Sequence, residues 1–163
     1  MIETYGTDRE VIEEGMKKLK AGEFAEAILF FTEVIKNSKD PKAIAAAYYR
    51  RGNAKRNLNQ LAIDDFKKAH DLNQDNYGYQ RIIGIYLVEL LRDEEAIVEL
   101  DKTLSQKPDD VYVLCALMEA HAHMGNIEKA IELYNKIDEI DHDKAVEFHH
   151  IYVKAVALSP NMS

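Results

Sequence analysis

The residues best suited to metal binding or catalysis gather between positions 115 and 150. They are Cys115, Glu119, His121, His123, His149 and His150. If the helices that carry them pack together, His123 approaches His149, and a zinc ion would then need Cys115 or Glu119 as further ligands. His121 and His123 lie two residues apart on one predicted helix, so they point in different directions and form a poor chelating pair. Ordinary surface and groove histidines are the better interpretation, and we predict no metal site.

The other chemically active residue types have no catalytic pattern. The acidic pairs Glu13-Glu14 and Glu94-Glu95 fall at exposed positions of predicted helices, which is typical of a solvated helix face rather than of an acid–base pair. The sequence has no glycine-rich phosphate loop and no serine at a nucleophile elbow. Cys115 has no nearby base that would activate its thiol, so a small packing or groove residue is expected there. We therefore predict that the chain is not an enzyme and requires no cofactor.

The charge and the cysteine content limit the location and the partners. The 163 residues carry a formal net charge of −8, whereas phosphate binding needs a basic surface, so nucleic acid is not an expected partner. One cysteine allows no internal disulfide, which favours a reducing compartment. The segment Met1–Met16 lacks the basic and apolar regions of a secretion signal, and the apolar stretches are too short to cross a membrane. We predict a cytoplasmic protein that does not insert into a membrane.

A repeat of about 34 residues organises most of the chain. It is defined by three aligned sets of residues: a small residue followed by isoleucine, a large apolar residue four positions later, and a glycine or methionine upstream. The small residues are Ala27, Ala62, Ala96 and Ala130, the large ones Phe31, Phe66, Leu100 and Tyr134, and the upstream ones Gly15, Gly52, Gly84 and Met118. The last three alanines are 34 residues apart and the first step is 35. A fixed period of this length is typical of a stacked repeat protein.

The segments Ala47–Ala54, Leu90–Ile97 and His123–Tyr134 resemble the tetratricopeptide repeat (TPR) family, and the resemblance covers residues 8–144. It implies an all-α fold, a right-handed superhelix of four helix–turn–helix repeats within one domain, residues 1–163. We place the repeats at 8–44, 45–76, 77–110 and 111–144, followed by a capping helix at 145–158. The small residues would let neighbouring helices approach closely, and burial of each large one should contribute about 1.5–3 kcal/mol.

The repeats are not uniform. Repeat 1 carries three extra residues around Ser38 to Pro41, which predicts a longer loop before repeat 2. Repeat 2 lacks two residues just after Leu61, so its second helix should start abruptly. Lys55 also stands where the family usually has an aromatic residue. We expect repeat 2 to pack least regularly.

The segment Ala145–Leu158 has the apolar spacing of one more amphipathic helix, which Ser159-Pro160 would end. Its apolar face is formed by Val146, Phe148, Ile151, Tyr152, Ala155 and Val156. We expect this helix to cover repeat 4, as terminal caps do in repeat proteins. The alternative is a helix through which two copies form a homodimer.

The resemblance also implies a concave groove lined by the first helix of each repeat. The predicted lining is Ile12, Met16, Leu19 and Lys20 in repeat 1, Tyr49, Asn53, Arg56 and Asn57 in repeat 2, Arg81, Ile85, Val88 and Glu89 in repeat 3, and Tyr112, Cys115, Glu119 and His123 in repeat 4. This lining is apolar and aromatic with three basic residues, a composition that favours protein binding. The alternative is that Ile12, Met16, Ile85 and Val88 are mostly buried by neighbouring helices.

The best-known ligand clamp of the family, which holds the C-terminal carboxylate of chaperone tails, is not expected here. Ile12 and Met16 replace its lysine and asparagine in the first repeat, and Gly78 and Ile82 replace its basic residues in the third. We predict instead an adaptor or scaffold that binds a peptide segment or helix of another protein. A self-assembling structural protein and a substrate-specific chaperone are the alternatives.

Overall fold

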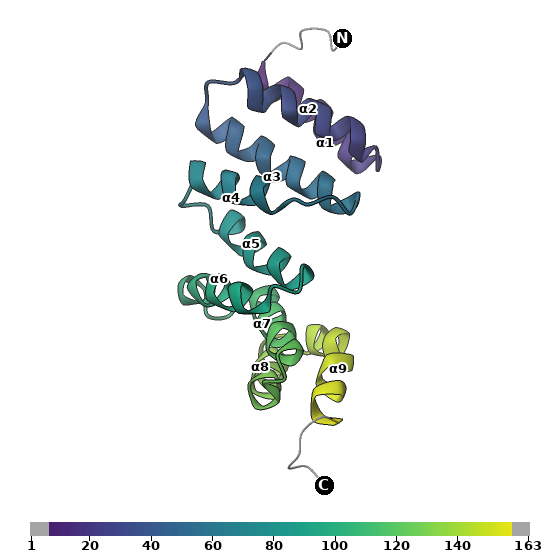
Figure 1. The fold of residues 1–163 in the computed structure, drawn as a ribbon, viewed down its shortest axis with the longest axis vertical. Helices are drawn as coiled ribbons and strands as arrows, with labels where there is room; N and C mark the ends of the chain where they lie inside the picture. Colours follow the sequence, from purple (N-terminus) through teal and green to yellow (C-terminus); the bar gives the residue numbers. More distant parts are fainter. Residues whose placement is uncertain (1–6, 158–163) are drawn as a thin grey trace. The chain divides into compact units, whose positions relative to one another are not determined.

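The computed structural model describes residues 7–157, and within this range the chain forms nine helices and no strands (Figure 1). The helices are α1 (Asp8–Lys20), α2 (Phe24–Asn37), α3 (Pro41–Asn57), α4 (Ile63–Leu72), α5 (Tyr77–Glu89), α6 (Asp93–Gln106), α7 (Val111–His123), α8 (Ile127–Ile140) and α9 (His142–Ala157). The predicted all-α class is confirmed for these residues. The expected helix at 145–158 is present as α9 but begins three residues earlier.

Several predictions fall outside the described part of the chain. They concern the first six residues of Met1–Met16, the side chains of Ala155 and Val156, and the helix end at Leu158 to Pro160. Among the described helices, not one has the length and apolarity needed to span a membrane.

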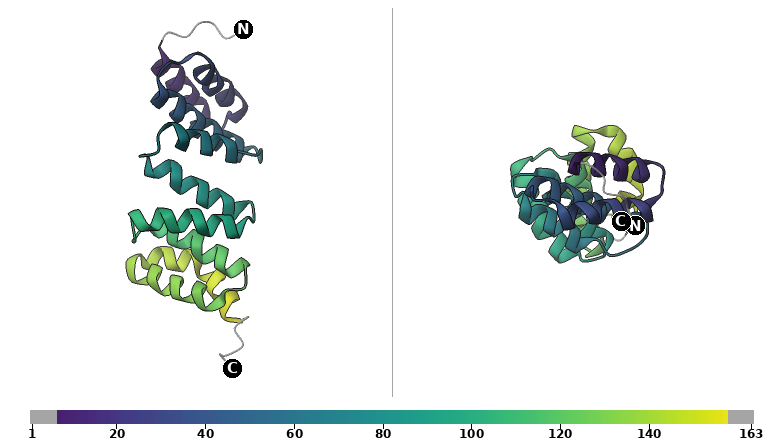
Figure 2. Two further views of the ribbon diagram at one scale, coloured as in Figure 1. Left: turned by 60° about the vertical axis from the view of Figure 1, so that its left-hand side comes forward. Right: turned by 90° about the horizontal axis from the view of Figure 1, so that it is seen from above.

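The chain divides into two compact units, residues 1–80 and residues 81–163, with the division inside α5. We call them unit 1 and unit 2. Within each unit, helices that follow one another along the chain lie side by side (Figure 2). That the whole chain forms one domain with the four repeat boundaries given above stays a prediction.

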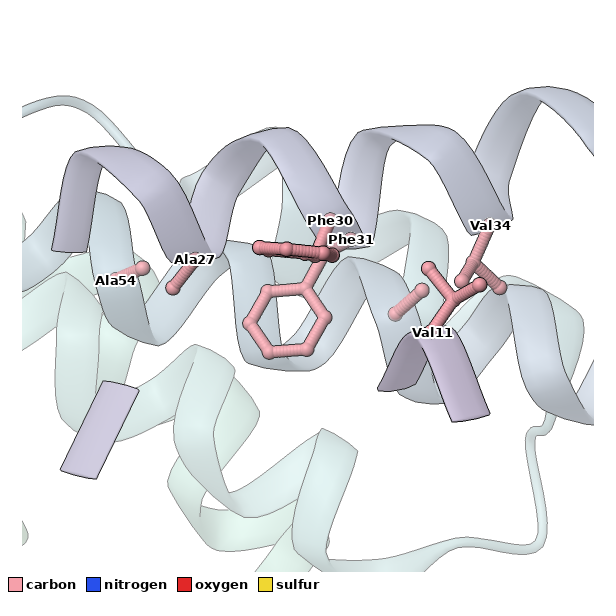
Figure 3. Close-up of a cluster of buried hydrophobic side chains, with 7 residues drawn as sticks. Val11, Ala27, Phe30, Phe31, Val34 and Ala54 are labelled. Atoms are coloured by element: carbon pink, nitrogen blue, oxygen red, sulfur yellow. The ribbon is translucent and has the colours of Figure 1, made fainter. Parts of the chain in front are cut away.

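The core of unit 1 lies between its first three helices. Phe30 and Phe31 of α2 pack with Val11 of α1 and Ala54 of α3 (Figure 3). Phe31 is fully buried, and burial of a side chain of this size contributes about 1.5–3 kcal/mol. The apolar face of α2 therefore holds α1 and α3 together.

Three first helices carry a glycine where they meet the second helix of their pair. A Cβ atom added at each glycine would lie 2.6–2.7 Å from an atom of a large apolar side chain, closer than carbon atoms normally approach. The predicted close approach is therefore confirmed at these positions, and the three large side chains are fully buried. The contacts are Gly15 with Phe31, Gly52 with Phe66, and Gly84 with Leu100.

The fourth helix pair differs from this pattern. Met118 occupies the position of the glycine and is fully buried, whereas Tyr134 is only half-buried. Because the methionine side chain fills the space that a glycine leaves open, the Tyr134 ring lies against α9. It stacks on Tyr152 with the ring centroids 4.2 Å apart, and its hydroxyl lies 2.9 Å from Nδ1 of His149. The expectation that Tyr134 fills the interior as the other large residues do was wrong.

The three extra residues of repeat 1 lengthen α3 rather than the loop before it. Only residues 38–40 separate α2 from α3, while α3 has 17 residues against 13 in α1, α5 and α7. The Asp40 carboxylate accepts a hydrogen bond from the Lys42 backbone N–H at 2.9 Å, and Pro41 takes the first helical position, where its missing N–H costs nothing. The predicted longer loop was wrong because this Asp-Pro pair starts the helix early.

The abrupt start predicted for the second helix of repeat 2 is confirmed. The helix α4 has ten residues, whereas α2, α6 and α8 have 14 each. Ala27, Ala96 and Ala130 are the fourth residues of their helices, but Ala62 lies one residue before α4, at its N-cap. The placement of Ala62 on a helix was therefore wrong, because the two residues missing after Leu61 remove the first turn.

A buried ion network joins α3 to this shortened helix. The Asp65 side chain is only 5% exposed and lies 2.7 Å from Nη2 of Arg51 and 2.9 Å from Nζ of Lys55. Arg51 also donates from Nη1 to the Thr32 hydroxyl at 3.2 Å. Burial by itself raises the pKa of Asp65, but the hydrogen bonds from Arg51 and Lys55 outweigh this and lower that pKa below its ordinary value. Lys55, at the position where an aromatic was expected, thus holds α4 by charge.

The core of unit 2 is built around α7. Six successive residues of this helix, from Val113 to Met118, are buried. The N-cap residue of this helix is Asp110, whose carboxylate accepts hydrogen bonds from the backbone N–H groups of Tyr112 and Val113. Both α6 and α8 pack against it, and α9 contacts α7 and α8 (Figures 1 and 2). Because α7 is covered on several sides, the side chains that it offers to a ligand are Tyr112 at its start and the unburied ones from Glu119 onward.

Candidate functional site

A pocket of about 600 Å³ opens in unit 2 between the turn after α5, the C-terminal half of α7, and α9. It has apolar walls and several charged or ionisable side chains. The lining residues are Leu91, Asp93, Glu119, Ala122, His123, His150, Ile151 and Lys154. A concave site with a few polar groups set in apolar walls is the usual form of a binding site.

The edge of this pocket at Leu91 has an unusual backbone. Leu91 has a φ of +56°, and the equivalent residue of the other three interhelical turns is Gly22, Asn59 or Gly125. Glycine and asparagine tolerate this left-handed conformation, whereas a bulky residue is strained in it. The turn is nevertheless closed, since the backbone N–H of Arg92 donates to the carbonyl of Leu87 at 2.9 Å. The result is a leucine side chain that is 70% exposed at the pocket edge.

Two carboxylates flank the His123 ring. Nδ1 of His123 lies 3.1 Å from Oδ1 of Asp93, and Nε2 lies 3.9 Å from Oε1 of Glu119. Because a carboxylate only accepts hydrogen bonds, Nδ1 carries the proton in the shorter contact. The Asp93 side chain is 11% exposed, while that of Glu119 is 39% exposed and open to a ligand. This wall of the pocket is therefore acidic.

The helix α9 supplies the remaining lining residues, His150, Ile151 and Lys154. The suggested approach of His123 to His149 is not what the structure shows, because His149 contacts Tyr134 and Tyr152 while His150 lines the pocket. The reason is the helical turn of about 100° between neighbouring residues, which places His149 and His150 on different faces of α9. Across residues 7–157, no three His, Cys, Asp or Glu side chains are grouped as metal ligands.

A second exposed feature of unit 2 is the tyrosine near the start of α7. The Tyr112 side chain is 56% exposed, and it lies beneath two cations. The guanidinium carbon of Arg81 is 5.5 Å from the ring centroid and the ammonium of Lys144 is 5.2 Å from it. Arg81 is held in place by Asp110, 3.1 Å from its Nη1. Such cation–π contacts fix the orientation of a ring that is still open to solvent.

The predicted groove residue Cys115 lies inside unit 2 rather than on its surface. It is 3% exposed, and burial raises the pKa of its thiol to about 12. A thiol of this kind is neutral at physiological pH and a poor nucleophile. Val88 is likewise buried, at 2% exposure. Neither side chain is therefore available on the surface of the described chain.

In unit 1, the α1 residues of the predicted groove lie partly against the core and partly at the surface. Ile12, Met16 and Leu19 are half-buried against the core cluster of α1–α3, and Lys20 is exposed. The Sδ atom of Met16 accepts a hydrogen bond from Nε of Arg50 at 3.0 Å. The alternative of burial by neighbouring helices thus applies in part to these apolar side chains.

Tyr49 of α3 forms an aromatic cluster with Phe66 of α4 and Tyr79 of α5. The Tyr49 ring lies 5.1 Å from that of Tyr79 and 6.1 Å from that of Phe66, measured between centroids. Asn57 is exposed and donates from Nδ2 to the backbone carbonyl of Asn53 at 2.9 Å. Asn53 and Arg56 are half-buried. In α5, Arg81 and Ile85 are half-buried and Glu89 is exposed.

Comparisons with known proteins agree with the repeat pattern. The family model described as "Tetratricopeptide repeat" matches residues 94–155, which includes α7, α8 and most of α9. Solved structures of such proteins match nearly the whole chain: MamA 41-end from Desulfovibrio magneticus RS-1 superposes with a TM-score of 0.74 at 20% identity, over 96% of this chain and 97% of that one. Residues 94–155 are thus similar to the TPR family, and the chain has the fold of TPR proteins. The predicted TPR superhelix is thereby confirmed as its fold.

Two further similar proteins are a solved TPR structure and a curated mouse protein. YrrB, described as "a TPR protein with an unusual peptide-binding site", has a TM-score of 0.69 at 20% identity, over 96% of this chain and 88% of its own. The mouse (Mus musculus) interferon-induced protein with tetratricopeptide repeats 3 is 27% identical over 128 residues. That match covers 76% of this chain but only 31% of the mouse protein. The chain thus spans about a third of the length of this curated relative.

The pocket includes two residues of the predicted lining, Glu119 and His123. Its other residues were not predicted as binding residues, because the α9 segment was assigned a capping role and the turn before α6 was not counted as lining. A usable signal was nevertheless present at Leu91, which stands in the turn position that holds glycine or asparagine in the other repeats.

Proposed function

We propose that this protein is a protein-interaction module that binds a peptide segment or helix of a partner at the exposed residues of its first helices, with the pocket of unit 2 as the main anchor site. The observation that supports this most directly is the exposed Leu91 side chain, held in a strained backbone conformation at the edge of the pocket. Strain of this kind costs about 1–3 kcal/mol, and it is found most often where a residue serves a function.

The exposed Tyr112 provides a second contact for the same partner. Tyrosine and arginine are the residue types most enriched where protein interfaces carry their binding energy, and here the Tyr112 ring lies under Arg81. The ring is already ordered by its two cations, so binding would cost it little conformational entropy. Glu89, an exposed member of the predicted lining in unit 2, extends the proposed surface.

Site-specific photo-crosslinking tests this proposal. A photoreactive phenylalanine analogue replaces Leu91 or Tyr112 in the full chain, and Leu29, which is 56% exposed on α2, serves as the matched control position. After irradiation in an extract of the cells that express the protein, mass spectrometry identifies the crosslinked proteins. We expect one common partner from Leu91 and Tyr112 and not from Leu29. Equal crosslinking from all three positions would contradict the proposal.

Self-association is a second candidate, and the surface of α9 favours it. Val146 and Val153 are seven residues apart on this helix and are 57% and 50% exposed, respectively. Two such stripes can pack against one another in a symmetric dimer. Light scattering over a range of concentrations distinguishes this candidate, since a dimer would be lost in Val146→Lys/Val153→Lys, whereas a constant monomer mass argues against self-assembly.

A further inference from the structure

We propose that the pocket between α7 and α9 binds an arginine side chain of the partner segment. This inference rests on the proposed function and names the chemistry of its anchor.

The charges in the pocket favour a cation. Asp93 and Glu119 contribute two carboxylates, and Lys154 is the one lysine or arginine among the lining residues. Among the lining Asp, Glu, Lys and Arg side chains, negative charge is therefore in excess by one. The Asp93 carboxylate is mostly shielded from solvent, so its charge is less screened than that of an exposed residue. Lys154 is exposed, and its long side chain can place the ammonium in water.

Asp93, Glu119 and His123 form the polar wall of the pocket. This wall suits a planar group that carries N–H donors on more than one side. The His123 ring presents Nδ1 to Asp93 and Nε2 to Glu119, so one flat ring faces two carboxylates. A guanidinium is also flat and carries five N–H donors in a fixed arrangement, and it binds carboxylates through paired hydrogen bonds. The Glu119 carboxylate is the more exposed of the two and lies 3.9 Å from the ring, longer than a hydrogen bond, so it is the acceptor available to a ligand.

The apolar residues suit the hydrocarbon part of an arginine side chain. Leu91, Ala122 and Ile151 line the same pocket, and they come from the α5–α6 turn, α7 and α9, respectively. A volume of about 600 Å³ holds an arginine together with part of a neighbouring residue. Arginine packs its three methylene groups on apolar surface while its charged end forms hydrogen bonds. Lysine shares the charge and the hydrocarbon chain but lacks the planar paired donors.

The test uses the full chain and short peptides of defined sequence. The probes are four acetylated and amidated pentapeptides, Ala-Leu-X-Leu-Ala, in which X is arginine, lysine, glutamate or citrulline, the last an uncharged analogue with the shape of arginine. Binding is measured from the backbone amide signals of Leu91, Ala122 and Ile151 by NMR titration. We expect the arginine peptide to bind at least about ten times more tightly than the citrulline peptide, which corresponds to about 1.4 kcal/mol. Lysine should fall between them, and glutamate should bind weakest.

Three variants test the role of the charges in the pocket. Glu119→Gln should reduce the preference for arginine over citrulline to about twofold or less, because the amide no longer accepts a charge-assisted pair of bonds. Glu94→Gln is the matched control, since Glu94 is exposed and does not line this pocket, and it should leave the preference unchanged. Lys154→Gln should strengthen arginine binding by removing a like charge. Circular dichroism confirms that each variant is folded.

Three results would overturn the proposal: equal affinity for the arginine and citrulline peptides, preference for glutamate, or weaker arginine binding in Lys154→Gln. Its failure is distinguishable from failure of the proposed function. Crosslinking of a partner at Leu91 without any arginine preference removes this inference alone. Selective arginine binding without a crosslinked partner instead contradicts the proposed function and leaves the chemistry of the pocket in place.

Discussion

The helix pair α3–α4 in unit 1 and the pair α7–α8 in unit 2 show two ways in which the two helices of a repeat are held together. In α3–α4 the second helix has lost its first turn, and the buried Asp65 is bound by Arg51 and Lys55. In α7–α8 the second helix has its full 14 residues, and α7 contributes an unbroken buried run from Val113 to Met118. The repeat pattern thus determines where helices meet, while the residues at the contact determine whether charge or apolar packing holds them.

Core truncation in each unit should give the largest effect and shows whether the two units unfold separately. Phe66→Ala in unit 1 should lower the free energy of unfolding by about 3–5 kcal/mol, and Leu100→Ala in unit 2 by about 2–5 kcal/mol, because both side chains are fully buried. Urea unfolding measures the loss, and hydrogen exchange locates it. We expect exchange to increase mainly in the unit that carries the substitution.

The exposed Leu29→Ala is the control for this pair and should change stability by less than about 0.5 kcal/mol. If either core variant increased exchange equally in both units, the chain would unfold as one cooperative body, and the comparison between units would lose its basis.

Removal of the buried carboxylate should give the next largest effect. Asp65→Asn at pH 7 should cost about 3 kcal/mol, the lower end for a broken buried ion pair, since Arg51 and Lys55 retain some contact with water. Because the pKa of Asp65 is lowered on folding, its contribution is present above the unfolded value of 3.8 and is lost as the pH falls through the folded value. The difference in stability between the wild type and the variant should therefore begin to shrink near pH 4 and disappear only below the folded pKa of Asp65.

Asp64→Asn is the matched control, because Asp64 is the exposed neighbour of Asp65 on α4. Thermal unfolding between pH 2.5 and 7 measures both variants. A difference between Asp65→Asn and wild type that stayed constant down to pH 2.5 would mean that the network does not depend on the charge of this carboxylate.

Truncation of the half-buried tyrosine should have a smaller effect than that of the buried phenylalanine at the equivalent position. Tyr134→Ala removes a stack on Tyr152 and should cost about 1 kcal/mol, since an aromatic pair contributes about 0.5–1.5 kcal/mol beyond burial. Phe66→Ala is the internal standard. A loss of 3 kcal/mol or more in urea unfolding would show that Tyr134 carries as much of the packing as the residues beside the glycines.

The smallest expected change is a gain in stability. Leu91→Gly should raise the free energy of unfolding by about 0.5–1 kcal/mol, because glycine adopts the positive φ of this turn without strain. Asn59→Gly, at the equivalent turn of unit 1, should gain less, since asparagine tolerates this conformation. Urea unfolding measures both. Under the proposed function, Leu91→Gly should also weaken binding of the arginine peptide, whereas equal or tighter binding would count against a role for the leucine.

The parts of the fold that could be predicted from sequence are those in which a residue type usually has one steric role. A glycine within a helix is costly, so Gly15, Gly52 and Gly84 indicated close contacts, and each does face a large side chain. In the fourth repeat Met118 takes the place of the glycine, and there the prediction for Tyr134 failed. The prediction treated the four repeats as equivalent and did not consider that methionine fills the space that glycine leaves open.

The ion network and most of the pocket could not be predicted in this way. A carboxylate in a charged sequence does not indicate whether it will be buried, and the position of Asp65 depends on the residue at which α4 begins. Glu119 and His123 were predicted from the repeat register. His150 and Lys154 were not, because their place beside α7 depends on how α9 packs, which the amphipathic pattern of a single helix does not specify.

The burial of Cys115 also has a practical consequence for spectroscopy. The single cysteine of the chain is 3% exposed, and burial raises the pKa of its thiol to about 12, so it should react very slowly with maleimide dyes in the native protein. Leu29→Cys on α2 and Val146→Cys on α9, both at well-exposed positions, can then be labelled with a fluorescent donor and acceptor without removing the native thiol.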